Sequence, residues 1–132
     1  DFDKAKESIR QLLRQKYLDL KNRRVPLEDL AFHVMIGKSP DKYTETTPQH
    51  VRAARLLMAR GKEVKAGEII SYVKTVTPPG VKPVSLATPE EIDADKYLEQ
   101  LKSTFDQILD ALGYEFNEIL GVTKLEEYFW GG

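Results

Sequence analysis

Residues Tyr43 to Val73 read YTETTPQHVRAARLLMARGKEVKAGEIISYV, and the rest of the chain is best understood outward from this stretch. Thr47 is a favourable helix N-cap, and Pro48 suits the first helical turn, where its missing N–H costs nothing. Gly61 provides the stop. The apolar residues between them recur at helical spacing: Val51, Ala54, Leu57 and Met58. The stretch therefore predicts a basic helix that is entered through a hydroxyl-rich loop and followed by a strand.

Two further helices are predicted from apolar stripes. The first stripe consists of Ile9, Leu12, Leu13, Tyr17 and Leu20. The last consists of Leu98, Leu101, Phe105, Ile108, Leu109 and Leu112. Gly113 follows the last stripe directly and is expected to be the C-cap of that helix.

Two short segments have the alternation or the β-branched composition of strands. Leu30 to Ile36 alternates apolar residues between two faces, and Ile69 to Val73 is rich in β-branched and aromatic residues. We expect these strands to pair with each other. The predicted order is helix, strand, helix, strand, proline-rich loop, helix and tail, which is a mostly helical α+β fold.

Composition favours one compact domain. The chain has 132 residues, of which 41% are hydrophobic, enough for a single core. We assign residues 1–121 to a single domain and residues 122–132 to a tail. There is no cysteine and there are only two histidines, so the sequence predicts neither disulfides nor a metal site. No apolar run approaches a membrane span, so we expect a cytoplasmic protein without membrane contact.

The net charge of −1 hides a strong segregation of charge along the chain. Residues 38–65 carry seven basic and three acidic residues, whereas residues 89–127 carry three basic and eleven acidic ones. A polyanion would be attracted to the first segment and repelled by the second. Any contact with nucleic acid is therefore expected in the first segment, although solvated faces of opposite charge would give the same pattern.

The order and spacing of several short motifs resemble those of a known family. They are Tyr43, the threonine-containing loop, Pro48, His50-Val51, Arg60-Gly61, and Gly67 leading into Ile69–Val73. Together they resemble the thumb region at the carboxyl end of archaeal-type family B DNA polymerases. The resemblance extends upstream to residues 25–30 and downstream to residues 93–114, so it covers almost the whole chain.

The chain departs from the family pattern at two places. Gln49 separates the proline from the histidine that often follows it directly, which shifts the register at the start of the helix by one residue. Residues 75–87, with three prolines, replace a hairpin that is usually rich in glycine and arginine. Lys82 in this loop would reach DNA only if the loop folds over the duplex.

No catalytic constellation is apparent in the sequence. It has no phosphate loop, no nucleophile elbow and no zinc-protease helix motif. Asp93 and Asp95 are close in sequence, but at a helix start they suit the positive end of the helix dipole better than a metal. The resemblance implies that this chain is part of a nucleotidyltransferase whose Mg²⁺-binding palm lies elsewhere, and that the chain itself holds no catalytic residue or cofactor. It would be a fragment, or the small subunit of a split polymerase.

A thumb has to hold duplex of any sequence, so its contacts should go to phosphates and sugars. From the resemblance and this chemistry, we expect DNA contacts from the loop and helix residues Thr44, Thr46, Thr47, Gln49, His50, Arg52 and Arg55. A second group, Ser71, Tyr72 and Lys74, follows on the strand. Several of them have a structural alternative: capping and turn formation for the threonines, a solvated charge for the arginines, a cap on the core for the histidine, and core packing for the tyrosine.

The tail suggests a separate partner. Leu125, Tyr128 and Phe129 have the spacing of a sliding-clamp-binding peptide, although the usual leading glutamine is replaced by Val122. The alternative is that these aromatic residues pack on the long helix. For the whole chain, the alternative to a thumb is a protein-interaction adaptor that uses the acidic helix and the aromatic tail. Steep salt dependence would distinguish a duplex-binding thumb from an adaptor.

Overall fold

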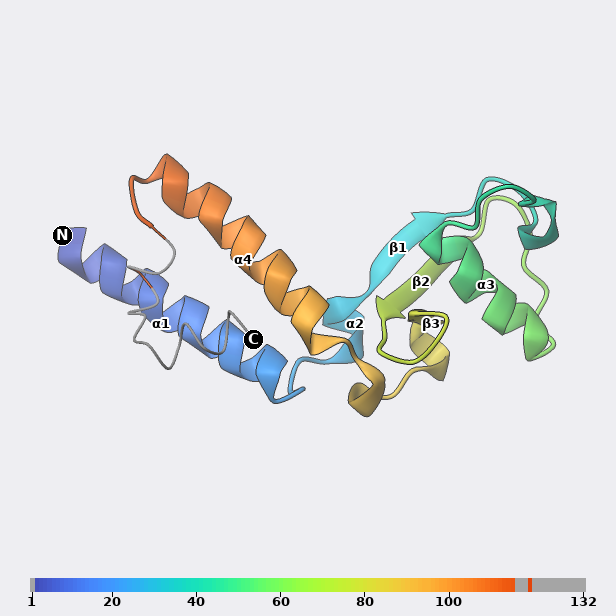
Figure 1. Cartoon of the computed structure of the whole chain (residues 1–132), viewed down its shortest axis with the longest axis horizontal. Coiled ribbons are helices and arrows are strands. Elements are labelled where there is room, and N and C mark those ends of the chain that lie inside the picture. Colours follow the sequence, from blue (N-terminus) through green and yellow to red (C-terminus); the bar gives the residue numbers. More distant parts are fainter. Residues whose placement is uncertain (1, 116–118, 120–132) are drawn as a thin grey trace. The chain divides into compact units, whose positions relative to one another are not determined.

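The computed structural model describes residues 2–115 and residue 119, which form two compact units (Figure 1). The helical unit contains the residues before 23 and those from 94 onward, and the sheet unit contains residues 23–93. With two long helices and one antiparallel sheet, the predicted α+β class with mostly helical content is confirmed. The assignment of residues 1–121 to one domain stays a prediction.

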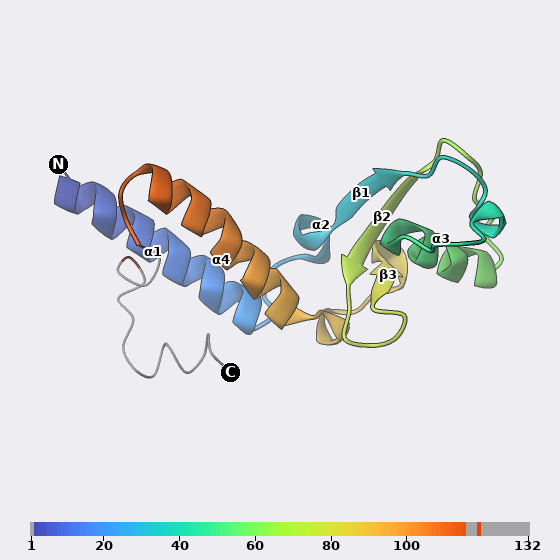
Figure 2. The ribbon, with the colours of Figure 1, turned by 45° about the horizontal axis from the view of Figure 1, so that its top comes forward.

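The helical unit is built from α1 (Phe2–Lys21) and α4 (Ala94–Ala111), which lie side by side in Figures 1 and 2. Helix α1 contains no glycine or proline and is rich in strong helix formers. The core of this unit consists of Leu13, Phe105, Leu109, Tyr114 and Ile119. Both predicted helices are therefore present.

The buried stripe of each helix in this unit is narrower than predicted. Leu12, Ile108 and Leu112 belong to the predicted apolar stripes but are half exposed, at 51%, 50% and 54%. A helix that faces one neighbour buries only the residues that point toward that neighbour, and the flanking positions stay open. Sequence periodicity alone does not distinguish the buried positions of an apolar stripe from the half-exposed positions that flank them.

The sheet unit contains a three-stranded antiparallel sheet of β1 (Phe32–Met35), β2 (Ile69–Lys74) and β3 (Val81–Pro83), with β2 in the centre. Strand β1 pairs with β2 in the register Phe32↔Tyr72 and Val34↔Ile70, which confirms the predicted pairing. Strand β3 lies in the segment predicted to be a loop. A proline is tolerated there because β3 is an edge strand, where a backbone N–H can be missing.

Helix α3 (Gln49–Ala59) packs on one face of this sheet. The core between them consists of Ile36, Val51, Ala53, Ala54, Val64, Ile70, Tyr72 and Val81. Successive residues of a strand point to opposite faces, so His33, Met35, Ile69 and Ser71 lie on the side away from α3. Met35 and Ile69, which are paired across the strands, are 62% and 56% exposed.

The ends of α3 differ in how well they were predicted. The helix begins one residue later than expected: Pro48 is its N-cap, and Thr47 makes no capping hydrogen bond. At the other end, Gly61 has φ 88°, its N–H donates to the Met58 carbonyl, and the Lys62 N–H donates to the Leu57 carbonyl. This is a Schellman ending, as predicted for a glycine at that position.

The remaining described elements are short. They are α2 (Leu27–Leu30) and three 3-10 turns at Pro40–Lys42, Val84–Leu86 and Pro89–Glu91. In the described part of the chain, no helix has the length and apolar character to cross a membrane.

Candidate nucleic-acid interface

Residues 43–48, here called the threonine loop, lead directly into the first turn of α3. Tyr43 anchors the start of this loop, because its side chain packs against the core of the sheet unit. Its ring meets the His50 ring edge to face at 6.4 Å, and the Lys38 ammonium lies 4.6 Å from its centroid. The side chains of Thr44 and Thr46 are exposed. The loop is therefore anchored at one end and presents hydroxyl groups to solvent at its middle.

Arg55, in the second turn of α3, reaches back to the same loop. Its Nη1 donates to Thr47 Oγ1 at 3.3 Å. Its Nη2 donates to the Tyr43 carbonyl at 2.8 Å and to the Pro40 carbonyl at 3.1 Å. The residue is exposed, yet its guanidinium is already occupied by three acceptors of the protein. Arg55 is therefore not a freely solvated charge, and its predicted contact with DNA stays a prediction.

Arg52 and Tyr72 come together from the helix and the sheet. Tyr72 is only 7% exposed; burial raises the pKa of its hydroxyl, and the nearby positive charge of Arg52 partly offsets this. Arg52 is half-buried, and its Nε, fully shielded from solvent, has no hydrogen-bond partner among the described residues. Two residues predicted to contact DNA are thus neighbours, with Arg52 the more accessible of the pair.

Of the other two strand residues in the predicted site, only Ser71 is separated from this pair. Ser71 lies on the opposite face of the sheet, where its Oγ is 2.7 Å from Nδ1 of His33. Lys74 extends over the Phe32 ring, with its Nζ 5.0 Å from the centroid. The structure therefore groups the threonine loop, Gln49, His50 and Arg52 at one end of α3 and places Ser71 elsewhere. Whether each of these residues contacts DNA stays a prediction.

Lys82, considered above as a remote DNA contact, is engaged within the protein. Its ammonium pairs with the Glu91 carboxylate, whose other donors are the Thr77 hydroxyl at 3.1 Å and the Thr88 N–H and hydroxyl at 3.1 and 3.0 Å. Chiefly because of Lys82, the pKa of Glu91 falls to about 2. This cluster, here called the Glu91 hub, fastens the turn between β2 and β3 to the segment before α4.

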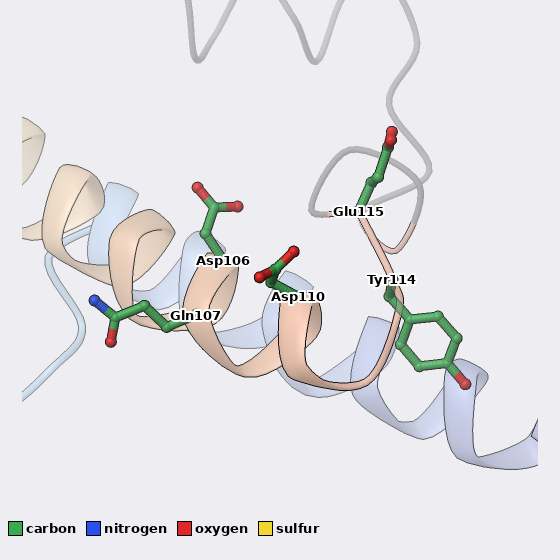
Figure 3. Close-up of a pocket in the computed structure, with 5 residues that line it drawn as sticks. All are labelled: Asp106, Gln107, Asp110, Tyr114 and Glu115. Atoms are coloured by element: carbon green, nitrogen blue, oxygen red, sulfur yellow. The ribbon is translucent and has the colours of Figure 1, made fainter.

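A hollow of about 420 Å³ lies at the carboxyl end of α4, in the helical unit (Figure 3). It is lined by Asp106, Gln107, Asp110, Tyr114 and Glu115. Asp106 is paired with Lys102 at 3.1 Å. Among the described residues, no group of three or more acidic, histidine or cysteine side chains is arranged to hold a metal ion. This acidic surface would repel phosphate, as expected from the charge distribution in the sequence.

Two features of the site were not found from the sequence. Arg55 bonds to backbone carbonyls of a loop that lies 12 and 15 residues earlier in the chain, and such a contact has no local sequence signature. The Glu91 hub, by contrast, has a local sequence signature, because Thr88 and Glu91 form a capping box that is recognisable as Thr-x-x-Glu. The predicted clamp-binding residues Leu125, Tyr128 and Phe129 lie outside the described residues.

The structure is thus a mostly helical α+β chain in which a hydroxyl-rich loop leads into the basic helix α3, while the carboxyl end of α4 is acidic. In a comparison with known families, residues 1–112 match the model of DNA polymerase family B. The chain belongs to that family.

Its relatives are archaeal DNA polymerases. The chain is 45% identical over 98% of its length to "DNA polymerase 1" of Saccharolobus solfataricus, and 39% identical over 96% to "DNA polymerase 1" of Aeropyrum pernix. The solved family B DNA polymerase of Pyrobaculum calidifontis superposes with a TM-score of 0.57 and 27% identity, over 69% of this chain and 12% of that one. The chain spans about 15% of the length of the first of these relatives and 13% of the second.

Proposed function

We propose that this chain is the thumb portion of a DNA-directed DNA polymerase and that it grips primer–template duplex through sugar-phosphate contacts, without sequence readout. The observation that carries this proposal is the arrangement at the amino end of α3. There the exposed hydroxyls of Thr44 and Thr46, the Gln49 amide and the Arg52 guanidinium follow one another along the loop and the first helical turn. Hydroxyls, guanidinium groups and helix amino ends are the groups that bind phosphate in proteins.

The distribution of charge supports the same surface. Residues 38–65 have a basic excess and belong to the sheet unit, whereas the acidic hollow of Figure 3 belongs to the helical unit. A polymerase has to move along duplex one nucleotide at a time, so contacts limited to the backbone are suitable for any sequence. We infer that the sheet unit carries the DNA contacts and that the helical unit contributes few.

In this proposal, the chemistry takes place in the palm, outside the matched region. The palm would supply the carboxylates and the Mg²⁺ ions for nucleotidyl transfer, whether it belongs to the same chain or to a separate one. The proposed partners are therefore duplex DNA, the palm and, through Leu125, Tyr128 and Phe129, a sliding clamp. The proposed setting is DNA replication at the chromosome inside the cell.

The experiment is a binding titration of the 132-residue chain with fluorescent primer–template duplex over a series of salt concentrations. Two unrelated duplex sequences should bind equally, and affinity should fall steeply with salt because bound phosphates release counterions. Arg52→Ala should weaken binding and reduce the slope of log K against log salt by about one.

Arg60→Ala is the matched control, because Arg60 is exposed and caps the opposite end of the same helix. It should change binding much less than Arg52→Ala. Equal losses in both variants would mean that only general charge matters. Binding that depends on the duplex sequence, or that is insensitive to salt, would contradict the proposal, and the second result would favour a protein-interaction adaptor.

A further inference from the structure

Arg55, which was predicted to contact DNA, makes three hydrogen bonds within the protein. It projects from α3 toward the threonine loop, and its three hydrogen bonds bracket that loop from both sides. Two of the acceptors, the carbonyls of Pro40 and Tyr43, precede the exposed hydroxyls of Thr44 and Thr46. The third, Thr47 Oγ1, follows them. One side chain therefore connects the two ends of the segment that presents the hydroxyls.

The shape of the guanidinium matters for this contact. Its nitrogens lie in one plane and donate in fixed directions, so two of them can bond acceptors from different parts of a loop at once. A lysine ammonium carries the same charge but is a single point at the end of a flexible stem. It cannot reproduce both the Nη1 contact to Thr47 and the Nη2 contacts to the two carbonyls.

The helix that carries Arg55 is held in place by buried side chains that pack on the sheet. Val51 and Ala54, on the neighbouring positions of α3, are fully buried against the sheet. The Tyr43 side chain is packed against the same core, so the loop has one apolar anchor and one polar one. Thr44 and Thr46 stand between these anchors, and their positions depend on both.

We propose that Arg55 is a positioning residue for duplex binding: it holds the threonine loop in the conformation that presents Thr44 and Thr46 to a phosphate, and it does not bind phosphate itself. This inference rests on the proposed function for its binding consequence. Its structural part, that the guanidinium fork orders the loop, is independent of DNA. Arg52, by contrast, would bind a DNA phosphate directly through its positive charge.

The test compares Arg55→Lys, Arg55→Ala and Arg52→Lys, each measured in two ways. The first measurement uses no DNA: backbone ¹⁵N relaxation gives the order parameters of residues 44–47. We expect values near 0.85 in the wild type and below about 0.6 in both Arg55 variants, with the rest of α3 unchanged. An unchanged loop in Arg55→Ala would overturn the proposal.

The second measurement is duplex affinity across salt concentrations. Arg55→Lys and Arg55→Ala should both lose affinity, by about threefold to tenfold, while the slope of log K against log salt changes by less than the roughly 0.9 expected for one lost phosphate contact. Arg52→Lys should retain most of its affinity, because it keeps the charge. If Arg55→Lys restored wild-type affinity while Arg55→Ala lowered the slope by a full contact, Arg55 would be a direct phosphate ligand.

The two measurements also separate this inference from the proposed function. If the wild-type chain failed to bind duplex at low salt but its loop lost order in both Arg55 variants, the thumb proposal would be in error and the ordering role of Arg55 would stand. If the wild type bound duplex and the loop kept its order in both variants, the thumb proposal would stand and the positioning role would be refuted.

Discussion

Replacing Glu91 by glutamine should destabilise the sheet unit, because one carboxylate receives four donors in the Glu91 hub. Glutamine has nearly the same shape but only one acceptor oxygen, and its NH₂ group would face Lys82, Thr77 or Thr88 as a second donor. The substitution therefore removes the ion pair and leaves at least one polar group without a suitable partner.

The size of the effect follows from the pKa of Glu91, which falls from 4.5 to about 2 on folding, with the Lys82 contact as its main cause. At 1.36 kcal/mol per unit, this sets an upper limit of about 3 kcal/mol. The Lys82 and Glu91 side chains are 27% and 17% exposed, so solvent screens part of the interaction. We expect a loss of about 1–2 kcal/mol at neutral pH.

The pH dependence gives the sharper test. Because the pKa of Glu91 is lowered in the folded state, its stabilisation is complete above pH 4.5 and is lost as the pH falls through about 2. The difference between the wild type and Glu91→Gln should therefore shrink on acidification. Unfolding in urea is followed through the amide signals of β2, which belongs to the same unit as the hub.

A double-mutant cycle with Lys82→Met isolates the pair, since the second substitution should cost little once Glu91 is glutamine. Equal destabilisation by Glu91→Gln at pH 7 and at pH 2, or full additivity with Lys82→Met, would refute the assignment of Glu91 as the centre of the hub.

Three further outcomes are expected. Leu109→Ala should destabilise the helical unit by about 2–5 kcal/mol, because Leu109 is fully buried in its core; thermal unfolding followed by circular dichroism measures this, with the half-exposed Ile108→Ala as the mild control. Gly61→Ala should lower the free energy of unfolding by about 1–2 kcal/mol, because a φ of 88° strains any residue with a Cβ even where space is open. Chemical denaturation measures this loss, and a loss below a few tenths of a kcal/mol would contradict the Schellman ending. The double substitution Tyr128→Ala, Phe129→Ala should abolish binding to an immobilised sliding clamp without changing duplex affinity, and retained clamp binding would exclude the tail as the anchor.

Local patterns in the sequence were sufficient for much of the fold. The alternation around Phe32 and Val34 predicted strand β1, and Gly61 and Gly113 marked the ends of α3 and α4 correctly. These features depend on near neighbours along the chain, so one sequence contains the whole signal. Strand β3 was missed because it has only three residues, and its proline argues against a strand unless the strand lies at an edge.

The interface was only partly accessible to the same reasoning. The charge excess and the hydroxyl-rich loop at the start of α3 are visible in the sequence. The pairing of Arg55 with the Pro40 and Tyr43 carbonyls is not, since it depends on how the chain turns between residues 40 and 55. The separation of Ser71 from Tyr72 follows from strand alternation, but which of them faces α3 was decided by tertiary packing.

The sheet unit is an uninterrupted segment placed between the two helices of the helical unit, and this has a consequence for the order of folding. Before the sheet unit folds, pairing α1 with α4 requires closing a loop of roughly seventy residues. In the folded sheet unit the two ends are close together, since Nη2 of Arg23 is 3.5 Å from the Ile92 carbonyl. The loop is then effectively a few residues long, which lowers the entropic cost of closure by about 2 kcal/mol. The sheet unit should therefore fold first and act as the linker that makes the helical hairpin possible.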